Sequence, residues 1–131
     1  YSIDLDSMHQ NWLYFEQLQD VPSFTTPAIT KTNFIVFGGT DNVLYSLHIS
    51  DGAIGFQYQS TSRILSQPIT DSRGFIYFST EDGRLYSLNQ YLNEVWMVKP
   101  TSRKLFNPVI LSSGNLVVAS SGGVLYSYAV E

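Results

Sequence analysis

The sequence of 131 residues contains no cysteine. This absence excludes disulfide bonds, thiolate metal sites and a cysteine nucleophile. It leaves the cellular compartment open, because a secreted fold with a good hydrophobic core needs no disulfide. No apolar run approaches the roughly 18 residues of a membrane-spanning helix, so we predict no direct membrane insertion. No signal peptide is visible and residue 1 is tyrosine, so we expect a mature form or an excised piece.

Charge is also scarce. Charged residues make up 14% of the chain, against about 25% in typical soluble domains. The net charge is −4, and an acidic chain is poorly suited to neutralising phosphates, so we expect no nucleic-acid partner. So few charges also suggest that more of the surface is covered than a chain of this length covers by itself.

Aromatic residues are abundant, at 15% of the chain. Tyrosine, phenylalanine and tryptophan favour pleated, half-buried surfaces, so the composition favours β-structure. The length indicates a single domain that is large enough to bury a real core.

The chain repeats itself with a period of about 41 residues. Three prolines are 41 and 40 residues apart, and so are three tyrosines in Leu-Tyr-Ser tripeptides: Pro27, Pro68 and Pro108, then Tyr45, Tyr86 and Tyr126. Length differences between copies fall in turns, as expected of a true structural repeat.

One copy of the repeat predicts four strands. In order, we predict a short strand that begins with Pro68, a turn at 71–74, a strand at 75–78, a hairpin connection at 81–83, a strand at 84–88 and a last strand that carries Trp96. A four-stranded antiparallel unit with this period is typical of a β-propeller blade, which buries its faces by stacking on its neighbours.

We therefore predict an all-β fold in which residues 1–131 form a single propeller segment, an incomplete arc of about three blades. The predicted division is a partial blade, two full blades and a second partial blade: 1–24, 25–62, 63–103 and 104–131. Residues 8–18 are also compatible with a short amphipathic helix. We favour a strand there, because Trp12 lies eleven residues after Tyr1, as Phe56 does after Tyr45.

The start of the chain resembles a known repeat. The segment YSIDLDSMHQNW is similar to the pyrroloquinoline-quinone-type (PQQ-like) propeller repeat, Tyr-x-Leu-Asp-x-x-Thr-Gly-x-x-x-Trp. The matching residues are Tyr1, Ile3, Asp4 and Trp12, with Ser7 at the threonine position. Later copies keep the motif in part, at Tyr45, Leu47, Gly52, Phe56, Tyr86, Leu88 and Trp96, but depart from it at His48, Asp51 and Asn89.

The resemblance implies that the tryptophan docks between adjacent blades and that the glycine makes the turn that permits it. It favours an extracytoplasmic location: periplasmic, secreted or lumenal. It does not specify a function, because the family includes quinone-dependent dehydrogenases, outer-membrane assembly lipoproteins, kinase sensor domains and scaffolds. By our count the chain supplies thirteen strands, which is about three blades of four strands. A closed ring needs about six to eight blades. The remaining blades would come from the parent chain or from a homo-oligomer.

Two loops between predicted blades repeat the tripeptide Thr-Ser-Arg, at 61–63 and 101–103. By propeller geometry these loops lie at the same end as the hairpins. We therefore name a candidate binding rim of Arg63, Arg103, Lys104, Asp41, Glu81 and Asp82. The alternative, which we favour, is that these residues form salt bridges between blades or solvated loops, worth at most about 1 kcal/mol per pair.

We predict no catalytic residue and no metal ligand. His9 and His48 have no acid or hydroxyl neighbour at a spacing typical of a triad. Asp4 and Asp6 are spaced like the start of a calcium loop, but no Asp-x-Asp-x-Asp-Gly follows. The aromatic residues recur in strand interiors without basic residues between them, so we interpret them as core rather than as a base-stacking surface.

We expect a non-enzymatic segment without a cofactor, which binds a protein or peptide as a scaffold or sensor. The alternative is a fragment of a quinone-dependent dehydrogenase. By resemblance, that enzyme needs a calcium site of Glu, Asn and Asp, a base Asp and a tryptophan platform under the quinone. Trp12 and Trp96 both lie at docking positions of the motif, so no tryptophan of this stretch is left for the platform.

Overall fold

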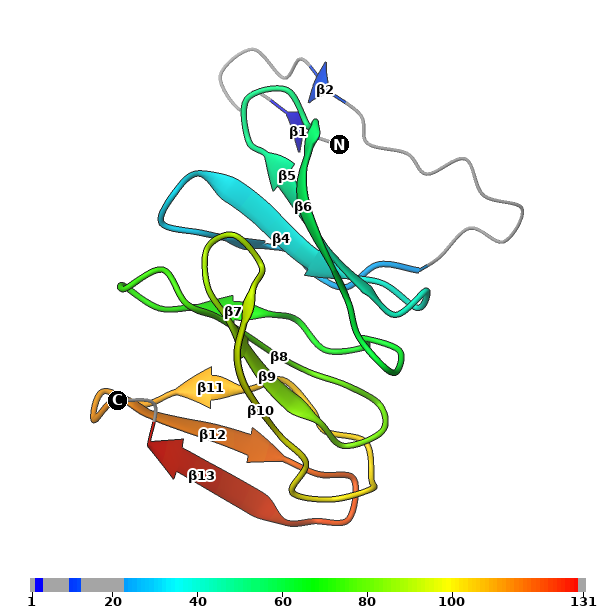
Figure 1. Cartoon of the computed structure of the whole chain (residues 1–131), viewed down its shortest axis with the longest axis vertical. Coiled ribbons are helices and arrows are strands. Elements are labelled where there is room, and N and C mark those ends of the chain that lie inside the picture. The colour runs from blue at the N-terminus through cyan, green and yellow to red at the C-terminus, as the bar shows by residue number, and fades with distance from the viewer. Residues whose placement is uncertain (1, 4–9, 13–22, 130–131) are drawn as a thin grey trace.

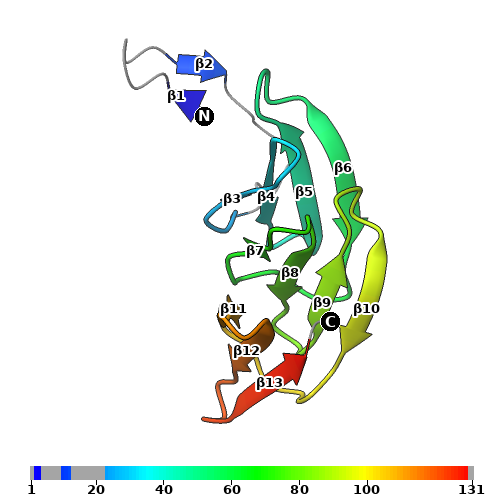
Figure 2. The ribbon, with the colours of Figure 1, turned by 90° about the vertical axis from the view of Figure 1, so that its left-hand side faces the viewer.

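The computed structural model describes residues 2–3, 10–12 and 23–129. Within these residues the chain forms thirteen strands in four antiparallel sheets, and no helix. The sheets follow one another in chain order along the long axis of the molecule (Figures 1 and 2). No helix that could cross a lipid bilayer occurs in this part of the chain. The predicted all-β class and open arc are confirmed.

The four sheets contain two, four, four and three strands. Sheet 1 pairs β1 (Ser2–Ile3) with β2 (Gln10–Trp12). Sheet 2 contains β3 (Ala28–Ile29), β4 (Phe34–Gly38), β5 (Val43–His48) and β6 (Ile54–Gln59). Sheet 3 contains β7 (Ile69–Thr70), β8 (Ile76–Ser79), β9 (Leu85–Leu88) and β10 (Glu94–Val98). Sheet 4 contains β11 (Val109–Ile110), β12 (Asn115–Ala119) and β13 (Leu125–Ala129).

Equivalent hairpins connect the two central strands of sheets 2 and 3 and the last two strands of sheet 4. Each hairpin has a left-handed residue at the same repeat position, with φ of 70° at Asn42, 88° at Gly83 and 79° at Gly123. Glycine and asparagine adopt this conformation most easily, which explains why they recur here. In sheet 3, β8 begins one residue later than we predicted. The reason is that the backbone N–H of Phe75 donates a hydrogen bond to the carboxylate of Asp71, in the preceding turn, at 3.0 Å.

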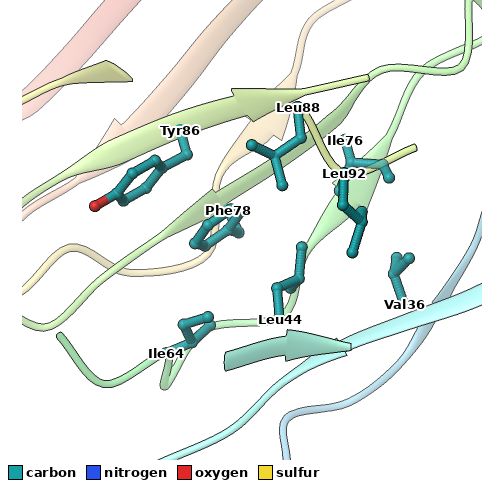
Figure 3. Packing of buried hydrophobic residues seen from close by; sticks show 8 residues of the cluster. All are labelled: Val36, Leu44, Ile64, Ile76, Phe78, Tyr86, Leu88 and Leu92. Atoms are coloured by element: carbon teal, nitrogen blue, oxygen red, sulfur yellow. The ribbon is translucent and has the colours of Figure 1, made fainter. Parts of the chain in front are cut away.

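The core lies between the sheets. Eight buried side chains fill the junction of sheets 2 and 3, and Figure 3 shows them pointing toward one another: Val36, Leu44, Ile64, Ile76, Phe78, Tyr86, Leu88 and Leu92. The junction of sheets 3 and 4 repeats this arrangement one period later, with Tyr77, Leu85, Leu105, Leu116 and Val118. The recurring apolar and aromatic residues are therefore core residues, since stacking the sheets removes them from water.

Trp12 docks on the turn of the following sheet, as the resemblance implied. Its indole Nε1–H donates to the carbonyl oxygen of Ile49 at 3.0 Å. A Cβ atom at Gly52, where φ is 72°, would lie 2.5 Å from the indole ring. Gly52 is therefore required twice, for its backbone conformation and for the close approach of the ring. Gln10–Trp12 is a strand and not part of a helix; the other residues of 8–18 lie outside the described residues.

Candidate functional site

Hairpins and inter-sheet loops lie along one edge of the molecule, the right-hand side of Figure 1, which is one end of the strands in every sheet that they connect. The same backbone hydrogen bond holds each hairpin to the loop that precedes its sheet. It joins Thr40 N–H to Ser23 O at 3.0 Å, Glu81 N–H to Arg63 O at 3.0 Å, and Ser121 N–H to Lys104 O at 2.8 Å. We call this end the rim. All six predicted site residues lie on its loops and hairpins.

Arg63 and Glu81 form a two-pronged ion pair on the rim. The Nε and Nη2 atoms of Arg63 each donate to one carboxylate oxygen of Glu81 at 2.7 Å. Hydrogen bonds from Arg63 hold the pKa of Glu81 below its ordinary value, and the charge of Lys104 acts in the same direction. The side chains remain 52% and 37% exposed, so solvent screens the pair. The structure thus pairs Arg63 with Glu81, and the positive charge of Lys104 acts on the same carboxylate without forming an ion pair with it.

Asp82 belongs to a second network, which spans sheets 2 and 3. It pairs with Arg84 and accepts a hydrogen bond from Thr80 Oγ1 at 2.5 Å. Thr61, in the loop that leaves sheet 2, donates to Asp82 at 3.3 Å and accepts from Arg84 Nη1 at 3.0 Å. Arg84 was not among the predicted residues. The only hint in the sequence is its position two residues after Asp82, across the hairpin turn.

Asp41 serves its own hairpin. Its carboxylate accepts hydrogen bonds from the hydroxyl of Tyr45 and, at 3.3 Å, from the backbone amide of Val43. Tyr45 is buried, so this carboxylate satisfies a polar group of the core. Asp41 is therefore directed into sheet 2, away from the charges of the other hairpins.

Arg103 and Lys104 form none of the ion pairs found among the described residues. Among the described residues these pairs are Arg63–Glu81, Arg73–Asp71 and Arg84–Asp82. The Nζ atom of Lys104 lies 5.4 Å from the centre of the Phe106 ring. The stem of Arg103 lies across the next hairpin, since a Cβ atom at Gly122 would be 2.7 Å from its Cδ atom. Sheet 4 has Ser121 and Gly122 where sheet 3 has Glu81 and Asp82, so the opposing carboxylates are missing there.

Two polar contacts away from the rim were not predicted. Tyr58 of sheet 2 donates to Glu94 of sheet 3 at 2.6 Å, and burial together with this bond raises the pKa of Tyr58. At the opposite end, Asp71 accepts from Tyr77 at 2.9 Å and from Arg73 at 3.0 Å. Burial and the bond to Asp71 raise the pKa of Tyr77 to about 12. Burial acts to raise the pKa of Asp71 itself, but the hydrogen bonds outweigh it and lower that pKa.

The described residues contain no group of three or more His, Cys, Asp or Glu that could hold a metal ion. His48 is exposed, and its ring lies 4.6 Å from the ring of Phe34. His9, Asp4 and Asp6 lie outside the described residues. What the rim offers chemically is charge and hydrogen bonding at an exposed surface.

Solved structures with this arrangement decide the fold. The chain is similar to the WD40 β-propeller domain of Doa1 over 88% of its own length and 38% of that chain, with a TM-score of 0.75 and 14% identity. The fold is a β-propeller arc. We therefore refer to sheets 1–4 as blades 1–4.

Two further structures agree. BamB from Moraxella catarrhalis matches over 97% of this chain and 42% of that chain, with a TM-score of 0.76 and 17% identity. The computationally designed Ika4 protein matches over 87% and 69%, with a TM-score of 0.72 and 13% identity. The propeller segment thus spans less than half of the BamB chain. No protein-family model and no curated protein sequence matches it. These similarities establish the propeller fold alone.

Proposed function

We propose that this propeller segment is a non-catalytic binding module, of the PQQ-like type that its motifs resemble, and that it holds a protein or peptide at the rim. The observation that carries the proposal is the position of Arg103 and Lys104. They lie side by side in one rim loop, outside the ion pairs of the described residues. The aromatic side chains, by contrast, pack within and between blades.

The chemistry of these two cations favours a partner segment rich in carboxylates. A guanidinium binds a carboxylate through two parallel hydrogen bonds, and a nearby ammonium adds charge without a fixed direction. Because the rim is exposed, each contact is weak by itself and is screened by salt. A peptide would therefore have to engage several rim groups at once.

The dehydrogenase alternative draws no support from the described residues. No metal-binding group lies among them, and Trp12 is occupied by docking on the turn of blade 2. The residues at hand do not fit a calcium and quinone site, so we derive no chemistry from one.

Binding of a fluorescently labelled acidic peptide, chosen from a displayed peptide library, tests the proposal by anisotropy. We expect Lys104→Glu to weaken binding about tenfold, a change of about 1.4 kcal/mol. Lys31→Glu is the matched control, since it makes the same charge change in the exposed turn between β3 and β4, away from the rim. Binding should also weaken as salt is added. Equal affinities of the two variants would show that the rim does not bind the peptide.

A further inference from the structure

The loop before blade 4 meets the hairpin of that blade in the same way as the loop before blade 3 meets its own. At blade 3, the backbone N–H of Glu81 donates to the carbonyl oxygen of Arg63 at 3.0 Å. At blade 4, the backbone N–H of Ser121 donates to the carbonyl oxygen of Lys104 at 2.8 Å. Lys104 therefore occupies the position of Arg63, and Ser121 occupies the position of Glu81.

The hairpin of blade 3 carries two adjacent carboxylates, and each of them meets a cation of the same chain. Glu81 accepts two hydrogen bonds from Arg63, both at 2.7 Å. Asp82 pairs with Arg84. The two carboxylates of this hairpin are thus satisfied from within the chain.

The hairpin of blade 4 lacks both carboxylates, but two cations lie beside it. Ser121 and Gly122 stand at the two acidic positions, and Val124 stands where blade 3 has its second arginine. Lys104 supplies the first positive charge. Arg103 supplies the second, and its side chain crosses the position of the missing aspartate, since a Cβ atom at Gly122 would lie 2.7 Å from its Cδ atom and 3.2 Å from its Nε atom. Blade 4 therefore keeps two cations at positions that blade 3 fills with carboxylates.

A neighbouring blade does not close this part of a hairpin. Blade 3 has a blade on each side, and yet the side chains of Arg63 and Glu81 are 52% and 37% exposed. Ser121 and Gly122 are exposed as well. The equivalent positions of a rim hairpin are thus open to a partner even where the next blade is present.

We propose that two adjacent carboxylates of the partner, from a Glu-Asp or similar pair of residues, occupy the positions that Glu81 and Asp82 take in blade 3. The first carboxylate meets Lys104. The second meets Arg103, whose guanidinium can hold a carboxylate through two parallel hydrogen bonds. This assignment rests on the proposed function of the rim and specifies the acidic sequence that the rim binds. Blade 3 then contains an internally filled copy of the site, and blade 4 contains the open copy.

Ser121→Glu tests the assignment, because it returns to blade 4 the carboxylate that blade 3 carries and fills the first position from within. We expect the affinity for the library-selected acidic peptide, measured by fluorescence anisotropy, to fall about tenfold. Ser102→Glu is the matched control, since it adds the same charge to an exposed residue of the same rim loop but outside the hairpin. It should weaken binding by less than about threefold, because solvent and salt screen a charge that makes no direct contact. Equal weakening by the two variants would be an effect of net charge and would overturn the proposal.

The ionisation of the introduced carboxyl group gives a second readout that needs no peptide. An NMR titration of the Ser121→Glu variant follows the carboxyl carbon of the new side chain. We expect its pKa to lie below the ordinary value of a glutamate, as it does at Glu81 because of the hydrogen bonds from Arg63. An ordinary pKa would mean that Lys104 does not reach this position, and the assignment would be wrong.

The peptide sequence tests whether the two carboxylates must be adjacent. We expect the selected peptides to share two neighbouring acidic residues, and one glycine inserted between them to weaken binding about fivefold. Unchanged affinity after the insertion would overturn the proposal. If Lys104→Glu weakens binding while Ser121→Glu and the insertion do not, the rim binds an acidic peptide in another way and only this assignment fails. If Lys104→Glu has no effect either, the proposed function fails with it.

Discussion

Leu44 and Leu85 hold the same position in two successive blade junctions, and both are fully buried. Around them the two junctions keep the same apolar plan. At the rim they differ. The hairpin of blade 3 carries three charges, Glu81, Asp82 and Arg84, whereas the hairpin of blade 4 has Ser121, Gly122 and Val124 at those positions. The difference shows that packing between blades is what the repeat preserves, while the rim is free to vary.

The largest expected effect tests whether the two cores are equivalent. Leu44→Ala and Leu85→Ala each remove a buried side chain and leave a cavity, so we expect each to lower the free energy of unfolding by about 2–5 kcal/mol. Urea denaturation measures both, and the exposed Leu65→Ala should change it by less than about 0.5 kcal/mol. If one of the two substitutions left the free energy of unfolding unchanged while the other lowered it, the junctions would not be equivalent.

A second prediction separates the hairpins at the two junctions. Gly83 and Gly123 both have left-handed backbones, so alanine at either position costs about 1–2 kcal/mol. At Gly83 the added Cβ atom would also lie 2.1 Å from the carbonyl oxygen of Thr101, whereas at Gly123 nothing lies within 4 Å. We expect Gly83→Ala to be about 1–3 kcal/mol worse than Gly123→Ala in urea denaturation. Equal losses of unfolding free energy in the two variants would mean that the loop at Thr101 can move away from the added Cβ atom at no cost in stability.

Two buried serines distinguish the junctions on a smaller scale. Ser66 donates to the carbonyl oxygen of Leu105 across the junction of blades 3 and 4, at 3.1 Å. Ser46, in blade 2, has a buried hydroxyl with no hydrogen-bond partner among the described residues. We expect Ser66→Ala to cost about 1 kcal/mol and Ser46→Ala to be neutral or slightly stabilising. Thermal unfolding of the two variants gives the comparison, and a costly Ser46→Ala would reveal a partner for that hydroxyl.

The smallest expected effect concerns the charges of the rim. The pKa of Glu81 is lowered in the folded state, so its ionised form stabilises the fold at neutral pH. This contribution is lost as the pH falls through the lowered pKa, because the folded state must then take up a proton. The difference in Tm between wild type and Glu81→Gln should be small at neutral pH, shrink with salt and vanish in acid. Ser121→Gln, the same residue at the equivalent position of blade 4, should show no such pH dependence.

Much of the fold was predictable because it is repeated. The period of the prolines and of the Leu-Tyr-Ser tripeptides placed the strands of blade 3 within one residue of where they lie. The resemblance implied that the tryptophan of the motif docks between adjacent blades, as Trp12 does, but it did not name Gly52 as the residue that the indole meets. Repetition helps because each copy must satisfy the same packing, so its residues report the same structure several times.

The site was less predictable, because rim contacts join residues that the repeat does not relate. The sequence placed Asp41 beside Glu81 and Asp82 in one set, but a hydrogen bond from Tyr45 turns it into its own blade. Arg84 was not predicted as a site residue. Its guanidinium reaches Asp82 and Thr61 because the side chain is long, and not because of its position on the strand. Such partners depend on side-chain conformations that spacing alone does not specify.

The turn of blade 2 on which Trp12 docks has an equivalent turn in blade 3. In the two pairs, the larger docking ring faces the smaller turn residue and the smaller ring faces the larger one. In the first junction a large indole meets Gly52; in the next, the smaller Phe56 meets a turn where Leu92 is buried with φ of 59°. A tryptophan facing Leu92 would be more crowded than one facing Gly52, and a phenylalanine facing Gly52 would leave more open space than the indole does. Blades of this chain are therefore not interchangeable parts. Each docking ring matches the size of the turn residue in the blade that follows it. The order of the blades is therefore specified by side-chain volume as well as by the continuity of the chain.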